Sequence, residues 1–339
     1  MAATPLDLVG IGNAIVDVIA HADDRFLTAE GLAKGAMTLI DEARGAALYA
    51  RMAPGIESSG GSAANTIAGF ASFGGKAGFI GKVRADQLGQ VFRHDIVSLG
   101  VAYDTPAAAA GPSTARCLIM VTPDAQRTMA TYLGISTELG PEDLDRDAIA
   151  RAKIVYLEGY LWDPPRAKAA FVEAAKLAHD SGGQVALSLS DVFCIERHRA
   201  DFRDLVEGHV DILFANEAEL LALTQESDFE AALAAIRGKC RIAAVTRSEH
   251  GSMILAGGET IRVAAEPVAE VVDTTGAGDL YAAGFLFGLS RGLDMMGCGR
   301  LGSLAAAEVI AHVGARPQMS LQQLAAARCP DLMPKPQKG

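Results

Sequence analysis

The chain has 339 residues, half of which are hydrophobic, and a formal net charge of −11. This length allows a large α/β core with an appendage, whereas the acidic balance argues against a nucleic-acid partner, which requires clustered Lys and Arg. The five cysteines form no CxxC pair and no apolar run reaches the length of a membrane span, so we expect a cytoplasmic protein without a disulfide framework, a structural zinc site or a membrane partner.

Two strands are predicted near the start of the chain, and the second contains an acid. Residues 6–10 are an apolar run that leads through a Gly-Ile-Gly turn to Asn13. Residues 15–20 continue as an extended segment in which Asp17 stands among apolar neighbours. An acid in such a strand is either exposed on a one-sided sheet or directed into a cleft, and the spacing alone does not distinguish the two.

A Gly-Gly pair precedes the next predicted helix. Gly60 and Gly61 are followed by Ser62, two Ala and Asn65. Because glycine has no Cβ, such a turn allows a ligand to approach the backbone closely. An ordinary flexible loop before a helix is the alternative.

Residues 101–134 contain β-rich runs without a helix between them. The runs at 116–121 and 128–133 are joined by a turn-forming segment with Pro and Asp, which predicts a hairpin. Together with predicted strands at 15–20 and 36–40, this hairpin indicates a small separate sheet. We therefore predict a discontinuous β lid formed by residues 14–51 and 101–134. Residues 1–13, 52–100 and 135–329 are expected to form a large α/β domain. Residues 330–339 are expected to be a disordered tail.

Strands and helices alternate regularly after residue 141. Apolar strands are predicted at 154–157, 184–189, 210–214 and 242–246, and a hairpin follows at 252–263. This alternation is typical of an α/β fold with a doubly wound, mostly parallel sheet flanked by helices. Ligands of such sheets bind at the carboxyl ends of the strands, so the polar loops at these ends are expected to form one site.

The stretch at 271–288 carries the most specific signal. Two Val lead into the sequence from Asp273 to Asp279, DTTGAGD, and then into an apolar helix rich in Ala and Gly. The free N–H groups and the positive dipole end at such a helix start favour an anion. Asp279 is then either a helix cap or a base beside the anion, and a capped buried helix without a catalytic role is the alternative.

Two further polar loops follow predicted strands. Asn216 and Glu219 come after the strand at 210–214, where amide and carboxylate oxygens can hold Mg²⁺ through water. Capping of the next helix by Asn216 is the alternative. The loop from Thr246 to Gly251 is placed where it could lie along a nucleotide.

The order of these motifs resembles the ribokinase-like (PfkB) family of carbohydrate and nucleoside kinases, from residue 7 to residue 317. Gly-Gly…Asn, Asn-Glu-x-Glu and Asp-Thr-Thr-Gly-Ala-Gly-Asp carry the resemblance, and no P-loop is present. Within the family the chain is most similar to adenosine kinases, through Gly12-Asn13 with Asp17 and through the segments 59–62, 187–190 and 210–216.

The resemblance implies transfer of the γ-phosphoryl group of ATP to the 5′-hydroxyl of a nucleoside, adenosine to AMP, with Mg²⁺. A sugar kinase of the ribokinase or fructokinase type is the first alternative, and a non-catalytic nucleotide- or nucleoside-binding sensor is the second. The implied partners are ATP and a small-molecule acceptor, in a monomer or a homodimer.

The resemblance also assigns roles in phosphoryl transfer. Asp279 matches the catalytic base, and the backbone N–H groups of Gly276, Ala277 and Gly278 match the anion hole. Arg127, on the lid hairpin, matches an Arg that closes over the phosphates. The alternative for this role is Arg116.

Other matches concern the acceptor, the nucleotide and metal ions. The groups that hold the acceptor are matched by Asn13, Asp17, Gly60, Gly61, Asn65 and Tyr160. Tyr160 matches an aromatic residue that stacks on the purine, and a core Tyr is the alternative. The nucleotide and Mg²⁺ motifs are matched by Asn216, Glu219, Thr246 and Gly251, and a K⁺ site of the ribokinase branch is matched by Asp273 and Thr275. One departure is Ser248, which stands where the family usually has Gly and leaves the shape of the nucleotide loop open.

Overall fold

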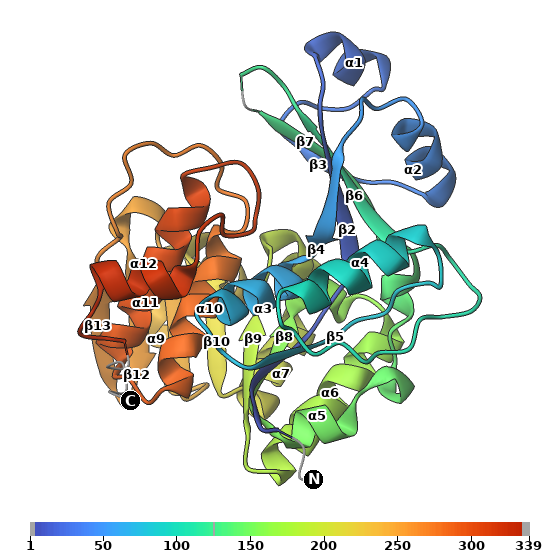
Figure 1. Ribbon diagram of the computed structural model, residues 1–339. Helices are drawn as coiled ribbons and strands as arrows, with labels where there is room; N and C mark the ends of the chain where they lie inside the picture. Colours follow the sequence, from blue (N-terminus) through green and yellow to red (C-terminus); the bar gives the residue numbers. More distant parts are fainter. Residues whose placement is uncertain (1–3, 125, 334–339) are drawn as a thin grey trace, which may run out of the picture.

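A computed structural model describes residues 4–124 and 126–333 of the protein. An eight-stranded sheet carries helices on both faces, and a separate five-stranded sheet projects from this body (Figure 1). The arrangement confirms the predicted α/β fold with a small second sheet.

The large sheet has the strand order β13-β12-β11-β10-β9-β8-β1-β5. The strands from β11 to β5 are parallel, and β12 and β13 form an antiparallel hairpin at one edge. The bounds are β1 (Leu6–Ile11), β5 (Ala77–Ile80), β8 (Ala152–Glu158), β9 (Gln184–Ser188), β10 (Ile212–Asn216), β11 (Ile242–Thr246), β12 (Ser252–Ala256) and β13 (Glu259–Val263).

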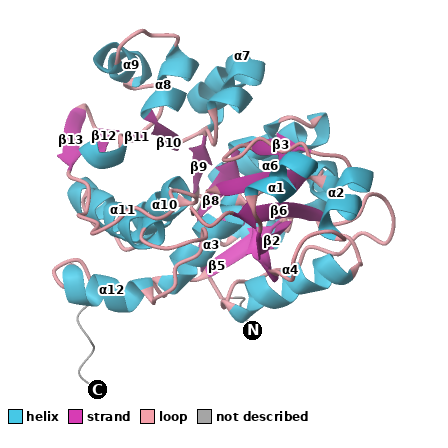
Figure 2. Ribbon diagram, turned by 90° about the horizontal axis from the view of Figure 1, so that it is seen from above, coloured by secondary structure: helices cyan, strands magenta, loops and turns pink. Residues whose placement is uncertain are grey.

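Two layers of helices cover the two faces of this sheet, as Figure 2 shows. One layer contains α3 (Ser62–Ser72), α4 (Gln87–Ser98), α10 (Ala277–Ser290), α11 (Met295–Ile310) and α12 (Leu321–Arg328). The other contains α5 (Arg146–Ala150), α6 (Pro165–Asp180), α7 (Val192–His209), α8 (Glu217–Thr224) and α9 (Phe229–Ile236). Tyr156 of β8 packs in the first core and Val155 in the second. Because both faces are buried, the strand is an almost continuous apolar run.

The helix that follows the DTTGAGD motif, α10, is buried along most of its length. Its small residues allow α11 to approach closely: a Cβ at Gly284 would overlap the backbone oxygen of Leu301. This close packing fixes the start of α10 relative to the sheet.

The small sheet has the order β3-β7-β6-β2-β4. Its strands are β2 (Ile15–His21), β3 (Met37–Leu39), β4 (Ile56–Gly60), β6 (Ala115–Val121) and β7 (Arg127–Tyr132), with α1 (Asp24–Ala29) and α2 (Glu42–Tyr49) in the same part of the chain. Two features differ from the predicted boundaries. β4 belongs to the small sheet although it lies within the range 52–100, and Ala102 bridges to Gly78 at the edge of the large sheet although it lies within the range 101–134.

Several elements were not expected from the sequence. The helix predicted after residue 141 is a short 3₁₀ turn, η2 (Pro141–Asp143), followed by α5, and both α1 and α12 are additional helices. In the tail, Asp331 forms an ion pair with Arg300, whereas residues 334–339 lie outside the described residues. Within the described ranges, no helix has both the length and the apolarity to cross a membrane.

Candidate active site

The carboxylate of Asp279, in the first turn of α10, is held by the start of α3. Ser62 Oγ donates a hydrogen bond to Oδ1 (2.6 Å), and Asn65 Nδ2 donates one to Oδ2 (3.0 Å). Burial raises the pKa of Asp279, whereas these two bonds and the attraction of Arg316 lower it. The result is an oriented carboxylate that accepts a proton more readily than an exposed one.

Asn65 also offers an unpaired acceptor beside Asp279. The side chain is buried, and its Oδ1 atom has no hydrogen-bond partner among the residues that the structure describes. A buried acceptor without a partner is costly, and a hydroxyl group of a ligand would satisfy it. The geometry therefore brings together the predicted base and one predicted acceptor-binding residue.

Asp17 and Gly60 are in direct contact. β2 and β4 are neighbours in the small sheet, and a Cβ at Gly60 would overlap the Asp17 carboxylate. Burial raises the pKa of Asp17 to about 6, opposed by the attraction of Arg316 and Arg127 and reinforced by the charge of Asp279. Asp17 is thus directed into the region of the other acid, which is the second of the two alternatives left open by its sequence.

Gly61 forms the turn into α3 next to Asn13. Its φ is 96°, and a Cβ there would overlap the backbone oxygen of Asn13. The Asn13 side chain is buried; its Nδ2 donates to Glu158 Oε1 (2.6 Å) and its Oδ1 accepts from Ser136 Oγ (2.8 Å). In this arrangement Asn13 fixes the turn through protein partners instead of presenting its amide to the site.

The glycine loop before α10 has the form of an anion site. Gly276 is the N-cap of α10 with φ 80°, and a Cβ there would lie 2.8 Å from the Cβ of Ala315. Within the described part of the chain, the N–H groups of Gly276 and Gly278 have no hydrogen-bond partner, whereas that of Ala277 donates to the oxygen of Thr274 (3.2 Å). Two of the three expected donors are therefore free for an anion.

Arg127 of the lid is tied to the strand end that precedes this loop. Its guanidinium forms an ion pair with Asp273, and both side chains are buried. Asp273 also accepts hydrogen bonds from the N–H groups of Thr275 (3.0 Å) and Gly314 (2.9 Å). These backbone bonds and the charge of Arg127 outweigh burial and lower the pKa of Asp273.

This network is a poor fit for the K⁺ site that the resemblance implied. The charge of Asp273 is already neutralised by Arg127, and both carboxylate oxygens accept bonds from the protein. The alternative lid residue, Arg116, lies away from this network: it is 3.4 Å from the oxygen of Glu42 and stacks over the ring of Tyr132.

Asn216 and Glu219 form a reciprocal capping box at the start of α8. Glu219 N–H donates to Asn216 Oδ1 (2.8 Å), and the Glu219 carboxylate accepts from the N–H (3.0 Å) and the amide (2.7 Å) of Asn216. Burial raises the pKa of Glu219 to about 7, and no Lys or Arg forms an ion pair with it in the described ranges. A buried carboxylate without a counter-charge fits a hydrated Mg²⁺.

The nucleotide loop begins beside this pair, because Thr246 of β11 lies opposite Asn216 of β10. Ser248 has a left-handed backbone with φ 49°, and Gly251 has φ 79°. The loop therefore keeps a backbone conformation that favours glycine at position 248, although Ser stands there.

Two exposed aromatic rings follow the adjacent strands β8 and β9. Tyr160, in the 3₁₀ turn η3 (Gly159–Trp162), is 37% exposed, and Phe193, in the first turn of α7, is 55% exposed. Burial of the hydroxyl and the charges of Asp191 and Asp279 raise the pKa of Tyr160. Tyr160 is thus not a core residue but lies within electrostatic range of the acids.

Besides Phe193, three residues of this region were not predicted from the sequence. Ser62 stands inside the Gly-Gly…Asn motif, so its position in the first turn of a helix was a usable signal. Glu158 accepts a bond from Ala63 N–H (2.7 Å), and burial raises its pKa to about 7. Arg316 binds the oxygen of Ala64, 252 residues away, a relation that no local spacing reveals.

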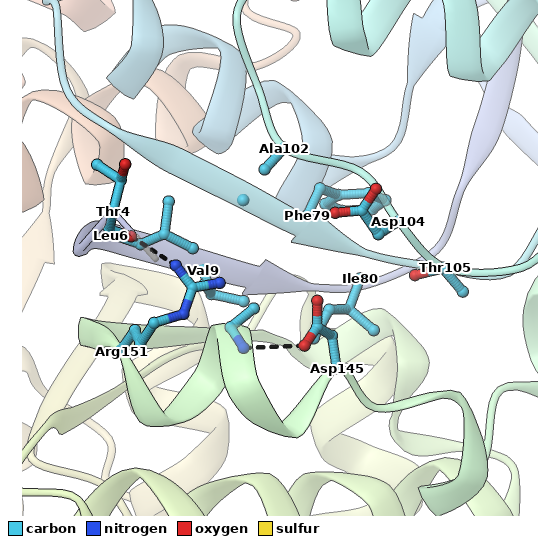
Figure 3. Close-up of a pocket in the computed structure, with 12 residues that line it drawn as sticks. Thr4, Leu6, Val9, Phe79, Ile80, Ala102, Asp104, Thr105, Asp145 and Arg151 are labelled. Atoms are coloured by element: carbon cyan, nitrogen blue, oxygen red, sulfur yellow. Dashed lines mark hydrogen bonds between the residues drawn. The ribbon is translucent and has the colours of Figure 1, made fainter. Parts of the chain in front are cut away.

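A small cavity of about 170 Å³ lies elsewhere, between β1, β5 and α5 (Figure 3). Two of its charged groups have partners: Arg151 donates to the oxygen of Thr4, and Asp145 accepts from Ala148 N–H (2.9 Å). None of the residues that line it belongs to the candidate site. The strand-end cluster around Asp279, and not this cavity, is the candidate active site.

The pfkB family carbohydrate kinase model matches residues 53–322, which include both glycine motifs and the Asn216 capping box. The chain belongs to this family. As a PfkB kinase, the protein is a phosphotransferase with an alcohol acceptor, of the adenosine kinase or sugar kinase type. Kinases of this family use ATP and Mg²⁺.

Three similar proteins extend this result. A probable sugar kinase from Rhizobium etli is 52% identical, with a TM-score of 0.90 over 98% of this chain and 100% of that one. Adenosine kinase from Sinorhizobium meliloti is 52% identical, with a TM-score of 0.89 over 96% and 99% of the two chains. An uncharacterized sugar kinase from Archaeoglobus fulgidus is 30% identical over 254 residues, or 73% of this PfkB kinase and 96% of the relative.

Proposed function

We propose that this PfkB kinase phosphorylates the 5′-hydroxyl of a nucleoside, with adenosine as its acceptor and ATP with Mg²⁺ as its donor. The observation that carries the proposal is that exposed aromatic rings, Tyr160 and Phe193, follow two adjacent strands, and that Tyr160 lies within electrostatic range of Asp279. A free sugar has no aromatic base to stack on such rings, whereas a purine does. The 52% identity to an adenosine kinase supports the same acceptor.

In this proposal Asp279 is the general base. Ser62 and Asn65 hold its carboxylate, so that it takes the proton of the acceptor hydroxyl as the phosphoryl group is transferred. A base of this kind contributes about 10²–10⁴-fold to the rate. Asp17 and the free Oδ1 of Asn65 bind the ribose hydroxyls, and Gly60 allows the sugar to approach the backbone.

Charge on the transferred phosphoryl group is stabilised by the start of α10. The free N–H groups of Gly276 and Gly278 hold this charge, and the helix dipole adds to their effect. Asn216 and Glu219 order the hydrated Mg²⁺, and Thr246 and Gly251 line the nucleotide loop. Mg²⁺, when bound, neutralises charge on the phosphates of ATP.

The small sheet acts as a lid over the acceptor. It reaches the anion loop through Arg127, whose ion pair with Asp273 joins β7 to the large domain. Closure over the acceptor would exclude water and suppress hydrolysis of ATP. Limited proteolysis of residues 113–134 with and without adenosine tests this; equal cleavage under both conditions argues against the lid.

A sugar kinase is the second candidate. The hydroxyl-binding groups Asp17 and Asn65 suit a free pentose or hexose as well as a ribose, and two of the similar proteins are described as sugar kinases. If the protein is a sugar kinase, Tyr160 and Phe193 do not contribute to acceptor binding.

The deciding experiment measures ADP formation with adenosine, other nucleosides, ribose and fructose. We expect the highest kcat/KM with adenosine, and an increase in its KM of about tenfold or more in Tyr160→Leu and Phe193→Leu, because each change removes a stacking surface. Tyr49→Leu, at an exposed ring of α2, is the matched control. High turnover of ribose or fructose without adenosine turnover would reverse the assignment, and no ADP with any acceptor would favour a nucleotide sensor.

A further inference from the structure

The guanidinium of Arg316, in the loop after α11, binds two backbone segments. One segment contains a residue that contacts Asp279, and the other contains a residue that contacts Asp17. The Nη1 atom of Arg316 donates to the oxygen of Ala64 (2.9 Å). Its Nη2 donates to the backbone oxygen (2.8 Å) and to Oγ (2.9 Å) of Ser59. Ala64 directly precedes Asn65, which binds Asp279, and Ser59 directly precedes the glycine that touches Asp17.

Two N–H groups of Arg316, one on Nη1 and one on Nε, make no hydrogen bond with the described residues. Its Nε is buried and has no partner in the part of the chain that the structure describes. The guanidinium therefore binds carbonyl oxygens with one edge and is not neutralised by a bidentate carboxylate, so that its charge acts on the acids around it.

We propose that Arg316 is a positioning residue of the phosphoryl-transfer site, which fixes the turn between β4 and α3 and supplies the positive charge that keeps Asp17 and Asp279 ionised. This inference rests on the role of Asp279 as the base. It extends that role by identifying the group that sets the pH range in which the base is active.

Arg316 is not needed to hold its own loop. Gly314 N–H donates to Asp273 Oδ2 (2.9 Å), and the N–H groups of Gln318 (2.9 Å) and Met319 (3.2 Å) donate to Glu308 Oε1. The loop is therefore fixed on both sides of Arg316 by backbone bonds. A neutral side chain at this position removes the charge and the two carbonyl contacts while leaving these bonds in place.

The charged groups around Asp279 are mostly acidic. Its charge acts on Asp17 from β2, Glu158 from β8 and Glu219 from α8, and on the phenols of Tyr156 and Tyr160.

The cation that acts on Asp279 is Arg316, whose pKa burial lowers to about 10 against the attraction of Asp95, Asp17 and Asp279. Arg127 also acts on Asp17, but it is already paired with Asp273. Asp95 accepts hydrogen bonds from the N–H (2.7 Å) and the Oγ (2.6 Å) of Ser59. Because several carboxylates and one cation, Arg316, act on Asp279, loss of that cation raises the pKa of Asp279 further.

The first test is the pH profile of kcat/KM with the accepted acceptor. We expect the acidic limb of Arg316→Gln to move upward by about one pH unit, because the base then protonates at higher pH. Arg316→Lys, which keeps the charge but loses the fork to two carbonyl groups, should keep the limb of the native protein and lose thermal stability. Arg300→Gln, at a surface ion pair, is the control. An unmoved limb in Arg316→Gln, or a limb moved by a full unit in Arg316→Lys, overturns the proposal.

The second test needs no acceptor, so it separates this inference from the proposed function. A double-mutant cycle in urea unfolding combines Arg316→Gln with Asp279→Asn at pH 8. We expect Arg316→Gln to raise the equilibrium constant of unfolding, and to raise it by about tenfold less when Asp279 is already Asn, because the uncompensated charge is then absent. Arg300→Gln combined with Asp279→Asn is the control cycle, in which we expect additive effects. Additive effects of Arg316→Gln and Asp279→Asn would overturn the proposal.

Discussion

Asn65 donates a hydrogen bond to the carboxylate of Asp279 at 3.0 Å, although 214 residues separate the two in the chain. The contact joins the first turn of α3 to the first turn of α10, two helices that begin at the glycine motifs of the family. It leaves the other end of the Asn65 amide free. The same side chain can therefore orient the base through its Nδ2 and accept a hydrogen bond from another hydroxyl of the acceptor through its Oδ1.

Replacement of the base tests this arrangement. We expect Asp279→Asn to lower kcat by about 10²–10⁴-fold, because the amide cannot accept the proton, while circular dichroism and thermal unfolding show a folded protein. Asp294→Asn is a matched control, because Asp294 caps α11 by accepting from Gly297 N–H (2.7 Å) and lies outside the site. Turnover of Asp279→Asn close to that of the native protein would remove Asp279 from the role of base.

The affinity for MgATP as a function of pH below 7 tests the role of Glu219. Its pKa is raised to about 7, so the carboxylate is increasingly protonated as the pH falls below 7, and protons then compete with the cation. We expect the apparent affinity for MgATP to fall by about tenfold per pH unit on this side and the dependence to flatten in Glu219→Gln. Glu230→Gln, at an exposed carboxylate of α9, is the control. A MgATP affinity that is constant between pH 5.5 and 7.5 would contradict the role of Glu219.

A methyl group at Gly60 tests the acceptor side of the site. A Cβ there overlaps the Asp17 carboxylate, so Gly60→Ala should displace Asp17 and raise the KM of the acceptor by about tenfold or more while the KM of MgATP changes little. Overpacking of this kind also costs about 1–3 kcal/mol of stability. Gly208→Ala, in α7 with open space around its Cα, is the control. Equal increases in both KM values would indicate a general distortion instead.

Removal of the lid cation tests the tie between the two sheets. Arg127→Met leaves the carboxylate of Asp273 buried without its partner, which typically costs about 3–5 kcal/mol. We expect a lower free energy of unfolding, faster proteolysis of the small sheet and reduced kcat. Arg116→Met, at the neighbouring strand, should change these quantities much less, because Arg116 forms no ion pair among the described residues and makes a long bond to a backbone oxygen and a stacking contact with Tyr132. Equal effects of the two substitutions would show that the ion pair has no special role.

The same ion pair predicts that the kinase does not require K⁺. Because Arg127 already neutralises Asp273, replacing K⁺ by tetramethylammonium should change kcat by less than about twofold. The assay compares both salts at equal ionic strength, since screening affects all surface charges. A loss of tenfold or more without K⁺ would mean that the pair opens during turnover and that a cation takes its place.

Local features of the sequence were sufficient for the fold class and for most of the groups in the candidate site. Apolar runs at regular spacing predicted the parallel strands, because burial on both faces leaves a continuous apolar pattern. The strand-loop-helix pattern around Asp279 predicted a free helix start, because only local geometry is needed to expose its N–H groups. The capping box of Asn216 and Glu219 depends on a spacing of three residues, which is equally visible in the chain.

The relations between distant segments were decided only by the tertiary structure. The ion pair of Arg127 with Asp273, the contacts of Arg316 with Ser59 and the membership of β4 in the small sheet join residues that local spacing does not relate. A buried charge is acceptable only where packing supplies its partners, and that packing depends on how the two sheets and the helix starts meet. Local patterns in the chain predicted most of the elements and the groups that end at the edge of the sheet. Packing between distant segments sets which of these groups are paired and which remain free for a ligand.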